Sequence, residues 1–155
     1  MTSPDTMRQR EQRFASALVH DGLRLTHQRL EIIREIAGAQ DHPDAEEILR
    51  RARRRVPTLA QDTVYRAMNV LADRGLVRRI TTPRATRFDP DTRPHYHFVC
   101  DACGRLEDVS EDMVPSLVTP FEELPVMLPG VGEVRAVHVE MCGRCLECQS
   151  QRSED

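Results

Sequence analysis

The sequence predicts an α+β protein, in which an N-terminal winged helix-turn-helix domain is followed by a small α/β domain with a four-cysteine zinc site. Three observations predict this fold. Three amphipathic helix patterns in the first half precede further helical and short strand patterns. The second half carries strand patterns and paired cysteines at metal-ligand spacing. Charge also divides, because residues 1–90 hold 17 arginines against 12 acidic residues, whereas residues 91–155 hold 5 against 13.

Glycines and capping residues mark the helices of the N-terminal half. A first amphipathic helix over 7–21 ends at Gly22. Thr26 is a good N-cap for a second helix, and Asp44 can cap a third that runs to about Arg54. The apolar stripe expected on the second helix is Leu30, Ile33, Ile36 and Ala37.

A fourth helix follows Pro57 and ends at Gly75, and two short strands come after it over 76–81 and 86–89. Helices followed by a two-stranded hairpin are typical of a winged helix, in which one helix enters the major groove of DNA. We therefore expect a DNA-binding domain over 1–89. The apolar positions of the fourth helix are Val64, Met68, Leu71 and Ala72.

The C-terminal half opens with a hinge over 90–94, which is rich in proline and polar residues. We expect a dimerisation and metal-binding domain over 95–148 and a polar tail over 149–155. The elements expected within this domain are strands over 96–99, 106–109 and 134–139 and a helix near 111–124.

No apolar run in the chain approaches the roughly 20 residues that a membrane span requires, and the first residues lack the hydrophobic stretch of a secretory signal. We therefore expect a cytoplasmic protein that does not bind membranes. Because cytosolic thiols stay reduced, the Cys-x-x-Cys pairs favour metal ligation over disulfides. Thiolate sulfur suits Zn²⁺, so structural zinc is the expected ion.

The order and spacing of several short segments resemble the ferric uptake regulator (Fur) family of metal-dependent repressors, from about residue 22 to residue 145. The matching segments are GLRLTHQR at 22–29, HP at 42–43, TVYR at 63–66, GLV at 75–77, RFD at 87–89, HYHFVC at 95–100, CG at 103–104, Asp108, and the cysteines at 142 and 145.

For the zinc site, the resemblance implies Cys100 and Cys103 from the first pair and Cys142 and Cys145 from the second. Cys145-Leu-Glu-Cys148 is a third Cys-x-x-Cys that overlaps the second pair. The family pattern favours Cys142 and leaves Cys148 as a spare thiol in the tail.

A second, regulatory metal site is also implied. His95 and His97 fall on one face of a strand, although two surface histidines would give the same pattern. Three imidazoles and two carboxylates form a nitrogen and oxygen shell that suits Fe²⁺ or Mn²⁺ better than zinc. The implied ligands are His42, Asp89, His95, His97 and Asp108.

Within the family, these ligand types resemble those of the peroxide-responsive repressors (PerR). Family members that respond to iron usually have Glu where this chain has Asp89 and Asp108. The resemblance implies that bound Fe²⁺ reacts with hydrogen peroxide and that His42 and His95 are oxidised, which would release the repressor from DNA.

The start of the fourth helix is the expected DNA-reading segment. Arginine can pair with guanine, and Tyr and Thr can contact a thymine methyl group or a phosphate. PerR-type proteins usually carry Asn at the place of Arg66, whereas iron-responsive members usually carry Arg. The expected DNA contacts are Gln61, Thr63, Tyr65 and Arg66.

Together these features predict a homodimeric repressor, and not an enzyme, that binds double-stranded operator DNA with Fe²⁺ or Mn²⁺ as corepressor. The nearest alternative is an iron-responsive or other metal-sensing repressor of the same family that does not sense peroxide. Two alternatives come from other classes. A hydrolytic metalloenzyme could use the His and Asp residues, but no general base is evident. A zinc-ribbon interaction module would contact only protein, and absence of metal-dependent DNA binding in a gel shift would favour it.

Overall fold

The computed structural model describes residues 4–93, 95–109 and 140–150. The chain divides into two compact units, Met1–Thr92 and Arg93–Asp155. The helix-rich first unit and the sheet of the second unit make the expected α+β fold. Within the described ranges, no helix is both long and apolar enough to cross a membrane.

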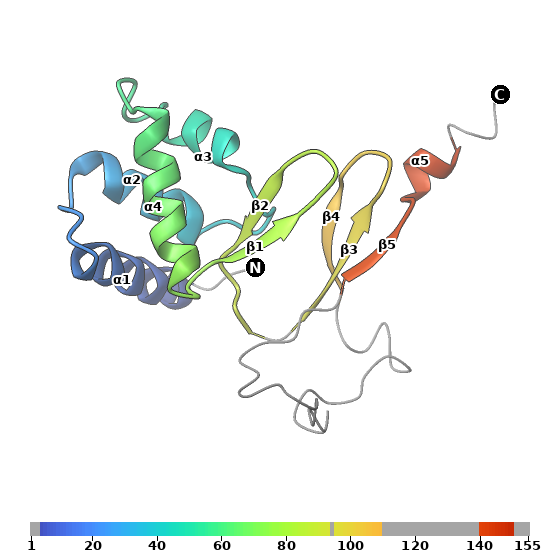
Figure 1. The fold of residues 1–155 in the computed structure, drawn as a ribbon, viewed down its shortest axis with the longest axis horizontal. Helices are drawn as coiled ribbons and strands as arrows, with labels where there is room; N and C mark the ends of the chain where they lie inside the picture. The colour runs from blue at the N-terminus through green and yellow to red at the C-terminus, as the bar shows by residue number, and fades with distance from the viewer. Residues whose placement is uncertain (1–3, 94, 110–139, 151–155) are drawn as a thin grey trace, which may run out of the picture. The chain divides into compact units, whose positions relative to one another are not determined.

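The first unit is built from four helices and a hairpin (Figure 1). The hairpin strands are antiparallel, with Arg78 opposite Asp89 and Thr81 opposite Thr86. Helices followed by this hairpin give the expected winged helix-turn-helix. Its elements are α1 (Pro4–His20), α2 (His27–Ala37), α3 (Ala45–Ala52), α4 (Gln61–Asp73), β1 (Arg78–Thr81) and β2 (Thr86–Asp89).

Side-chain caps begin two of these helices, as the sequence predicts. Thr26 Oγ1 accepts a hydrogen bond from the amide of Arg29 at 3.4 Å, and Asp44 Oδ1 accepts one from the amide of Glu47 at 2.8 Å. Helix α4 begins after Ala60, whose side chain offers no cap. In its first turn the amide of Thr63 donates to the carbonyl of Ala60 at 3.1 Å.

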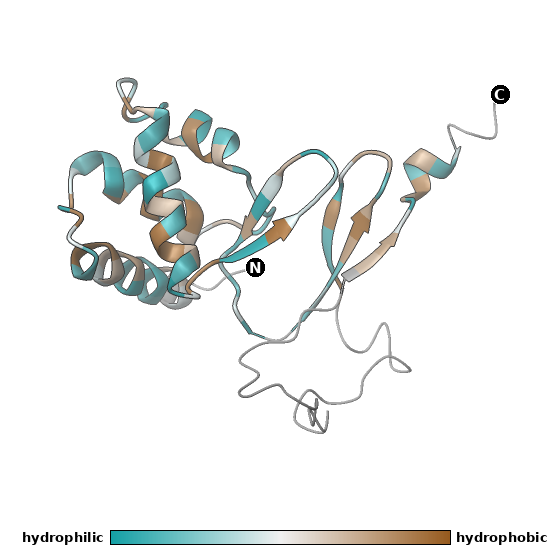
Figure 2. Cartoon of the chain, in the orientation of Figure 1, coloured by the Kyte–Doolittle hydropathy of each residue, from teal (hydrophilic) through white to brown (hydrophobic). Residues whose placement is uncertain are grey.

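The core of the first unit is aliphatic and lies where the helices meet. On α2 the buried stripe differs from the sequence prediction, because Ile32 is fully buried while Leu30 is 43% exposed. The helix contacts α1, α3 and α4 at once, so its buried face is wider and shifted. Figure 2 shows hydrophobic and hydrophilic residues alternating along these helices. The fully buried side chains include Leu18, Ile32, Ile36, Ile48, Val64, Met68 and Leu71.

The second unit contains a three-stranded sheet in the order β4-β3-β5. Strand β3 (Tyr96–Cys100) pairs antiparallel with β4 (Leu106–Val109) and parallel with β5 (Glu140–Gly143). A short helix, α5 (Leu146–Ser150), follows β5 and occupies the segment that the sequence assigned to the end of the domain and its tail. The helix expected near 111–124 and the strand expected over 134–139 lie outside the described residues.

Candidate metal centres

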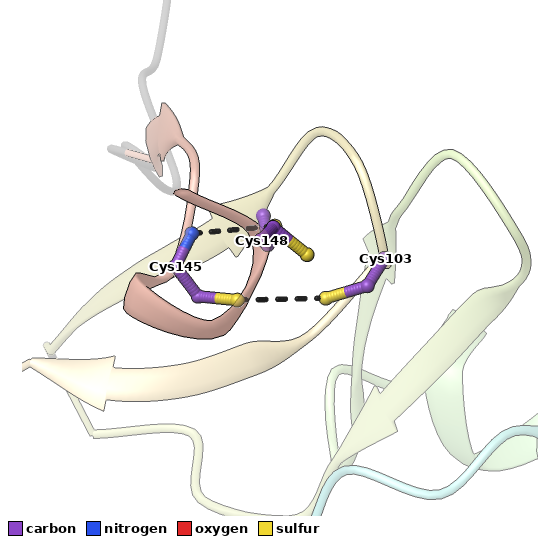
Figure 3. Close-up of side chains that lie close together, drawn as sticks. Cys103, Cys145 and Cys148 are labelled. Atoms are coloured by element: carbon purple, nitrogen blue, oxygen red, sulfur yellow. Dashed lines mark hydrogen bonds between the residues drawn. The ribbon is translucent and has the colours of Figure 1, made fainter. Parts of the chain in front are cut away.

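Four thiols of the second unit lie together. Their sulfur atoms are all within 4.8 Å of one another, and Cys103 Sγ is 3.8 Å from Cys145 Sγ. Figure 3 shows the side chains of Cys103, Cys145 and Cys148 gathered in one place. Four thiolates at this spacing form the tetrahedral shell of a structural zinc ion. The cluster consists of Cys100, Cys103, Cys145 and Cys148.

Cys142, which the sequence assigned to this site, is not in the cluster. It lies within β5, opposite Val99 of β3, and is exposed. Cys145 and Cys148 follow the strand, where α5 begins. A helical turn brings residues three apart onto one face, whereas a strand residue three positions away points elsewhere. In the structure the fourth thiol of the cluster is thus that of Cys148, and Cys142 lies apart from it.

The turn between β3 and β4 presents the first cysteine pair. Cys100 ends β3, and its amide donates to the carbonyl of Arg105 at 2.8 Å. Gly104 has φ 72°, a conformation that a side chain disfavours, and its amide donates to the carbonyl of Cys100 at 2.8 Å. This tight turn places Cys103 beside Cys100.

Backbone amides prepare one of these thiols for metal binding. Hydrogen bonds from the amides of Cys103 and Cys145 lower the pKa of the Cys100 thiol to about 6, because an N–H group stabilises a thiolate. Hydrogen bonding to the sulfurs of Cys145 and Cys103 raises the pKa of Cys148 to about 12. Crowded thiols cannot all ionise without a cation, and a divalent cation removes this restriction. The donor set fits zinc.

A second cluster joins β3 to β4. His97 lies opposite Asp108 in the strand pairing, and His95 is two residues away on the same face. The Nε2 atoms of the two histidines are 2.9 Å apart, and Asp108 Oδ1 lies 3.5 Å from His95 Nε2 and 3.4 Å from His97 Nε2. Two nitrogens bound at right angles to one ion would be separated by about 3 Å. These three residues can therefore share one ion.

The backbone orients His95 within this cluster. Its Nδ1 atom lies 2.8 Å from the carbonyl oxygen of Arg93. A carbonyl can only accept, so Nδ1 carries the proton and Nε2 keeps its lone pair for a metal. His97 is 3% exposed, which keeps its ring in a fixed position among packed neighbours.

The first unit brings together the two remaining predicted ligands. His42 and Asp89 are buried, at 4% and 2% exposure, and His42 Nε2 lies 3.9 Å from Asp89 Oδ1. The same carboxylate oxygen accepts a hydrogen bond from the amide of Asp91 at 2.7 Å. A buried imidazole beside a buried carboxylate supplies one nitrogen and one oxygen donor for a divalent ion.

The predicted DNA-reading residues lie on the first turns of α4. Tyr65 is 41% exposed, and Arg66 extends into solvent, where its Nε atom pairs with Asp62 Oδ2 at 2.8 Å. Gln61 is exposed and Thr63 is half-buried. The sequence analysis did not single out Asp62, although its spacing of four residues from Arg66 is the usual signal for a helical ion pair.

The chain is similar to known proteins over most of its length. The model of the ferric uptake regulator family matches residues 20–121. The chain belongs to this family. One relative, the peroxide-responsive repressor PerR of Staphylococcus epidermidis, is 31% identical over 133 residues, which cover 84% of each chain.

Solved Fur-family structures share the fold. The Helicobacter pylori ferric uptake regulator Fur, described as having three functional metal binding sites, aligns with a TM-score of 0.74 at 20% identity. That alignment covers 96% of this chain and 97% of the other. The Campylobacter jejuni peroxide stress regulator aligns with a TM-score of 0.64 at 25% identity, covering 88% and 97%.

Membership in the Fur family sets the general function. Its members are metal-responsive transcriptional regulators, which bind DNA and metal ions as dimers. The chain is therefore a regulator and not an enzyme.

Proposed function

We propose that the chain is a homodimeric repressor that binds operator DNA when it holds structural Zn²⁺ and regulatory Fe²⁺ or Mn²⁺, and that hydrogen peroxide releases it. The observation that carries the proposal is the convergence of His95 Nε2, His97 Nε2 and Asp108 Oδ1 within 3.5 Å of one another. Two imidazoles and one carboxylate form part of a ligand set for a divalent ion, and in a Fur-family regulator such an ion is suited to be the metal that the protein detects.

The four-thiol cluster is the proposed zinc site. Zinc would link the β3–β4 turn to the start of α5, whose first residue, Leu146, is 83% exposed and adds little to a core. Metal binding should therefore be coupled to folding of this unit. A dimer built on this unit predicts a pseudo-palindromic operator.

We assign His42 and Asp89 of the first unit to the same regulatory ion as His95, His97 and Asp108 of the second. The support is chemical: together they offer three nitrogens and two carboxylates, with no thiolate. Because these residues lie on both sides of the segment 90–94, one shared ion would restrict how the two units move. The ion then favours one arrangement, and DNA binding follows from that population shift.

The proposed peroxide sensing rests on the resemblance of the ligand set to that of the peroxide-responsive repressors, one of which is 31% identical to this chain. Bound Fe²⁺ would supply the electron that reduces hydrogen peroxide and generates an oxidant, whereas Mn²⁺ would bind without this reaction. His42 and His95 are the proposed targets, as the resemblance to the peroxide-responsive repressors implies. An oxidised ring is a poorer donor, so His42 and His95 would lose the ion and the chain would leave DNA.

A second candidate is a metal-sensing repressor that responds to iron or another metal and not to peroxide. Arg66 favours it, because iron-responsive members usually carry Arg at this position. The metal ligands and the DNA-reading residue thus indicate different relatives. We give more weight to Asp89 and Asp108, since ligands determine what is sensed, whereas Arg66 concerns the operator sequence.

Metal-dependent DNA binding tests the repressor proposal directly. A duplex selected from random DNA by the Mn²⁺-loaded protein should bind with a much lower Kd in Mn²⁺ than after chelation, as measured by fluorescence anisotropy. His97→Ala should abolish this difference, whereas His27→Ala, at an exposed residue of α2, should preserve it. Equal binding with and without Mn²⁺ would contradict metal-dependent repression.

A further inference from the structure

His42 has an unusual backbone. Its φ is 49°, in the left-handed region, and among the residues that the structure describes it is the only one other than glycine with positive φ. This conformation costs free energy and persists only where the surroundings hold it in place. His42 is also buried. Contacts from other residues must therefore hold His42 in this conformation.

Strand β2 holds the segment around His42 through its backbone and through one side chain. The amide of Phe88 donates to the carbonyl of Pro43 at 3.0 Å, and Asp44 forms an isolated bridge with Arg87. The Arg87 side chain adds a third contact, because its Nη1 donates to the carbonyl oxygen of His42 itself at 3.2 Å. The side chain of Arg87 thus bonds the strained residue directly.

Arg87 and Asp89 are two residues apart on β2, so their side chains lie on the same face of the hairpin. That face meets the His42 segment. The Arg87 Nε atom is buried and has no hydrogen-bond partner among the described residues. A buried donor without a partner is unfavourable, so the bond from Nη1 to His42 is made in spite of that cost.

We propose that Arg87 is a positioning residue for the regulatory metal: it fixes the His42 carbonyl and so aims the imidazole at the ion that Asp89 also binds. The inference rests on the proposed role of His42 as a ligand. Strand β2 then contributes to the metal site in two ways: Asp89 supplies a carboxylate ligand, and Arg87 orients His42. Contacts outside the ligand shell typically change metal affinity 10- to 100-fold.

The direction in which Mn²⁺ affinity changes when Arg87 is replaced distinguishes a positioning role from an effect of its charge. A guanidinium repels a nearby divalent cation, so if Arg87 acted by its charge alone, its removal would tighten Mn²⁺ binding. If it acts by positioning His42, removal weakens Mn²⁺ binding although a repulsive charge is lost. The two roles therefore give opposite results in one titration.

The test compares three variants of the full-length, zinc-loaded protein by Mn²⁺ titration with electron paramagnetic resonance. Arg87→Met keeps most of the aliphatic stem and loses the donor, and we expect its Mn²⁺ Kd to rise about tenfold. Arg87→Lys keeps a donor and should recover part of the affinity. Arg84→Met removes an exposed arginine from the same hairpin and should leave Kd unchanged.

A second readout addresses His42 alone. After Fe²⁺ and hydrogen peroxide, Arg87→Met should lower the oxidised fraction of the His42 peptide relative to the His95 peptide, which mere loss of stability would not do. Unchanged or tighter Mn²⁺ binding in Arg87→Met would overturn the inference. His42→Ala separately tests whether His42 is a ligand at all. Unchanged Mn²⁺ affinity in that variant would overturn the proposed ligand set, and not only the role of Arg87.

Discussion

Four of the five cysteines gather their sulfur atoms in one place, and the fifth, Cys142, lies apart from them. Cys142 is held in the ladder of β5 and is exposed, whereas Cys145 is buried and directly precedes α5. Cys148 completes the cluster one helical turn later. Its pKa is raised to about 12 by the neighbouring sulfurs, so its ionisation depends on a bound cation.

We expect Cys148→Ser to lose zinc and Cys142→Ser to keep it. The first change removes a thiolate from the four-sulfur shell, and the second alters an exposed strand residue. The amount of zinc that stays bound to each variant after dialysis against a chelator can be measured by elemental mass spectrometry. The thermal unfolding temperature is a second readout. Zinc loss in Cys142→Ser, with full zinc in Cys148→Ser, would restore the assignment based on the family pattern.

Asp62 restrains the arginine that is proposed to read DNA. Its carboxylate pairs with Arg66 at 2.8 Å, and both side chains are largely exposed, so the pair is worth only about 0.3–0.5 kcal/mol in the free protein. Its negative charge also repels DNA phosphates. Asp62→Asn should therefore bind the selected duplex about twofold or more tightly, as measured by anisotropy at several salt concentrations. Weaker binding would mean that the carboxylate orients Arg66 on DNA.

At the scale of elements, β2 connects the winged-helix unit to the two ligands that we propose this unit supplies to the regulatory ion. It forms one strand of the wing, carries Asp89, and contacts the segment that enters α3. Asp44 lies in that segment and caps α3, so the start of the helix and the His42 loop depend on the same few residues. A change in this segment should affect both stability and metal binding.

The two helix caps should differ in strength. The bond from the Glu47 amide to Asp44 is 2.8 Å, whereas that from the Arg29 amide to Thr26 is 3.4 Å. Asp44→Ala should cost about 1 kcal/mol or more of the free energy of unfolding, and Thr26→Ala about half as much. Urea unfolding of the zinc-loaded protein measures both. A larger loss in Thr26→Ala would contradict this ranking.

For the molecule as a whole, local patterns were predictable and contacts between distant residues were not. Caps at Thr26 and Asp44 and the hairpin strands follow from short segments, so the winged helix could be recognised in the sequence. The choice of Cys148 could not be, because overlapping Cys-x-x-Cys pairs have identical spacing and α5 was not expected. The bond between Arg87 and His42 joins residues 45 positions apart, which no local pattern reveals.

The regulatory site is likewise a property of the whole chain. Each unit positions its own proposed ligands: His42 with Asp89 in the first, and His95, His97 and Asp108 in the second. We propose that one ion needs both sets. This explains how oxidation of one imidazole could change DNA binding by a separate helix, since loss of the ion would free the two units from each other.

Peptide mass spectrometry of the zinc-loaded protein tests the central claim most directly. Samples with Fe²⁺ and with Mn²⁺ are compared before and after a mild dose of hydrogen peroxide. We expect one added oxygen on the peptide that holds His42 or His95, with Fe²⁺ only. Unmodified histidines in protein that demonstrably holds Fe²⁺ would contradict peroxide sensing and leave a repressor that responds to metal alone.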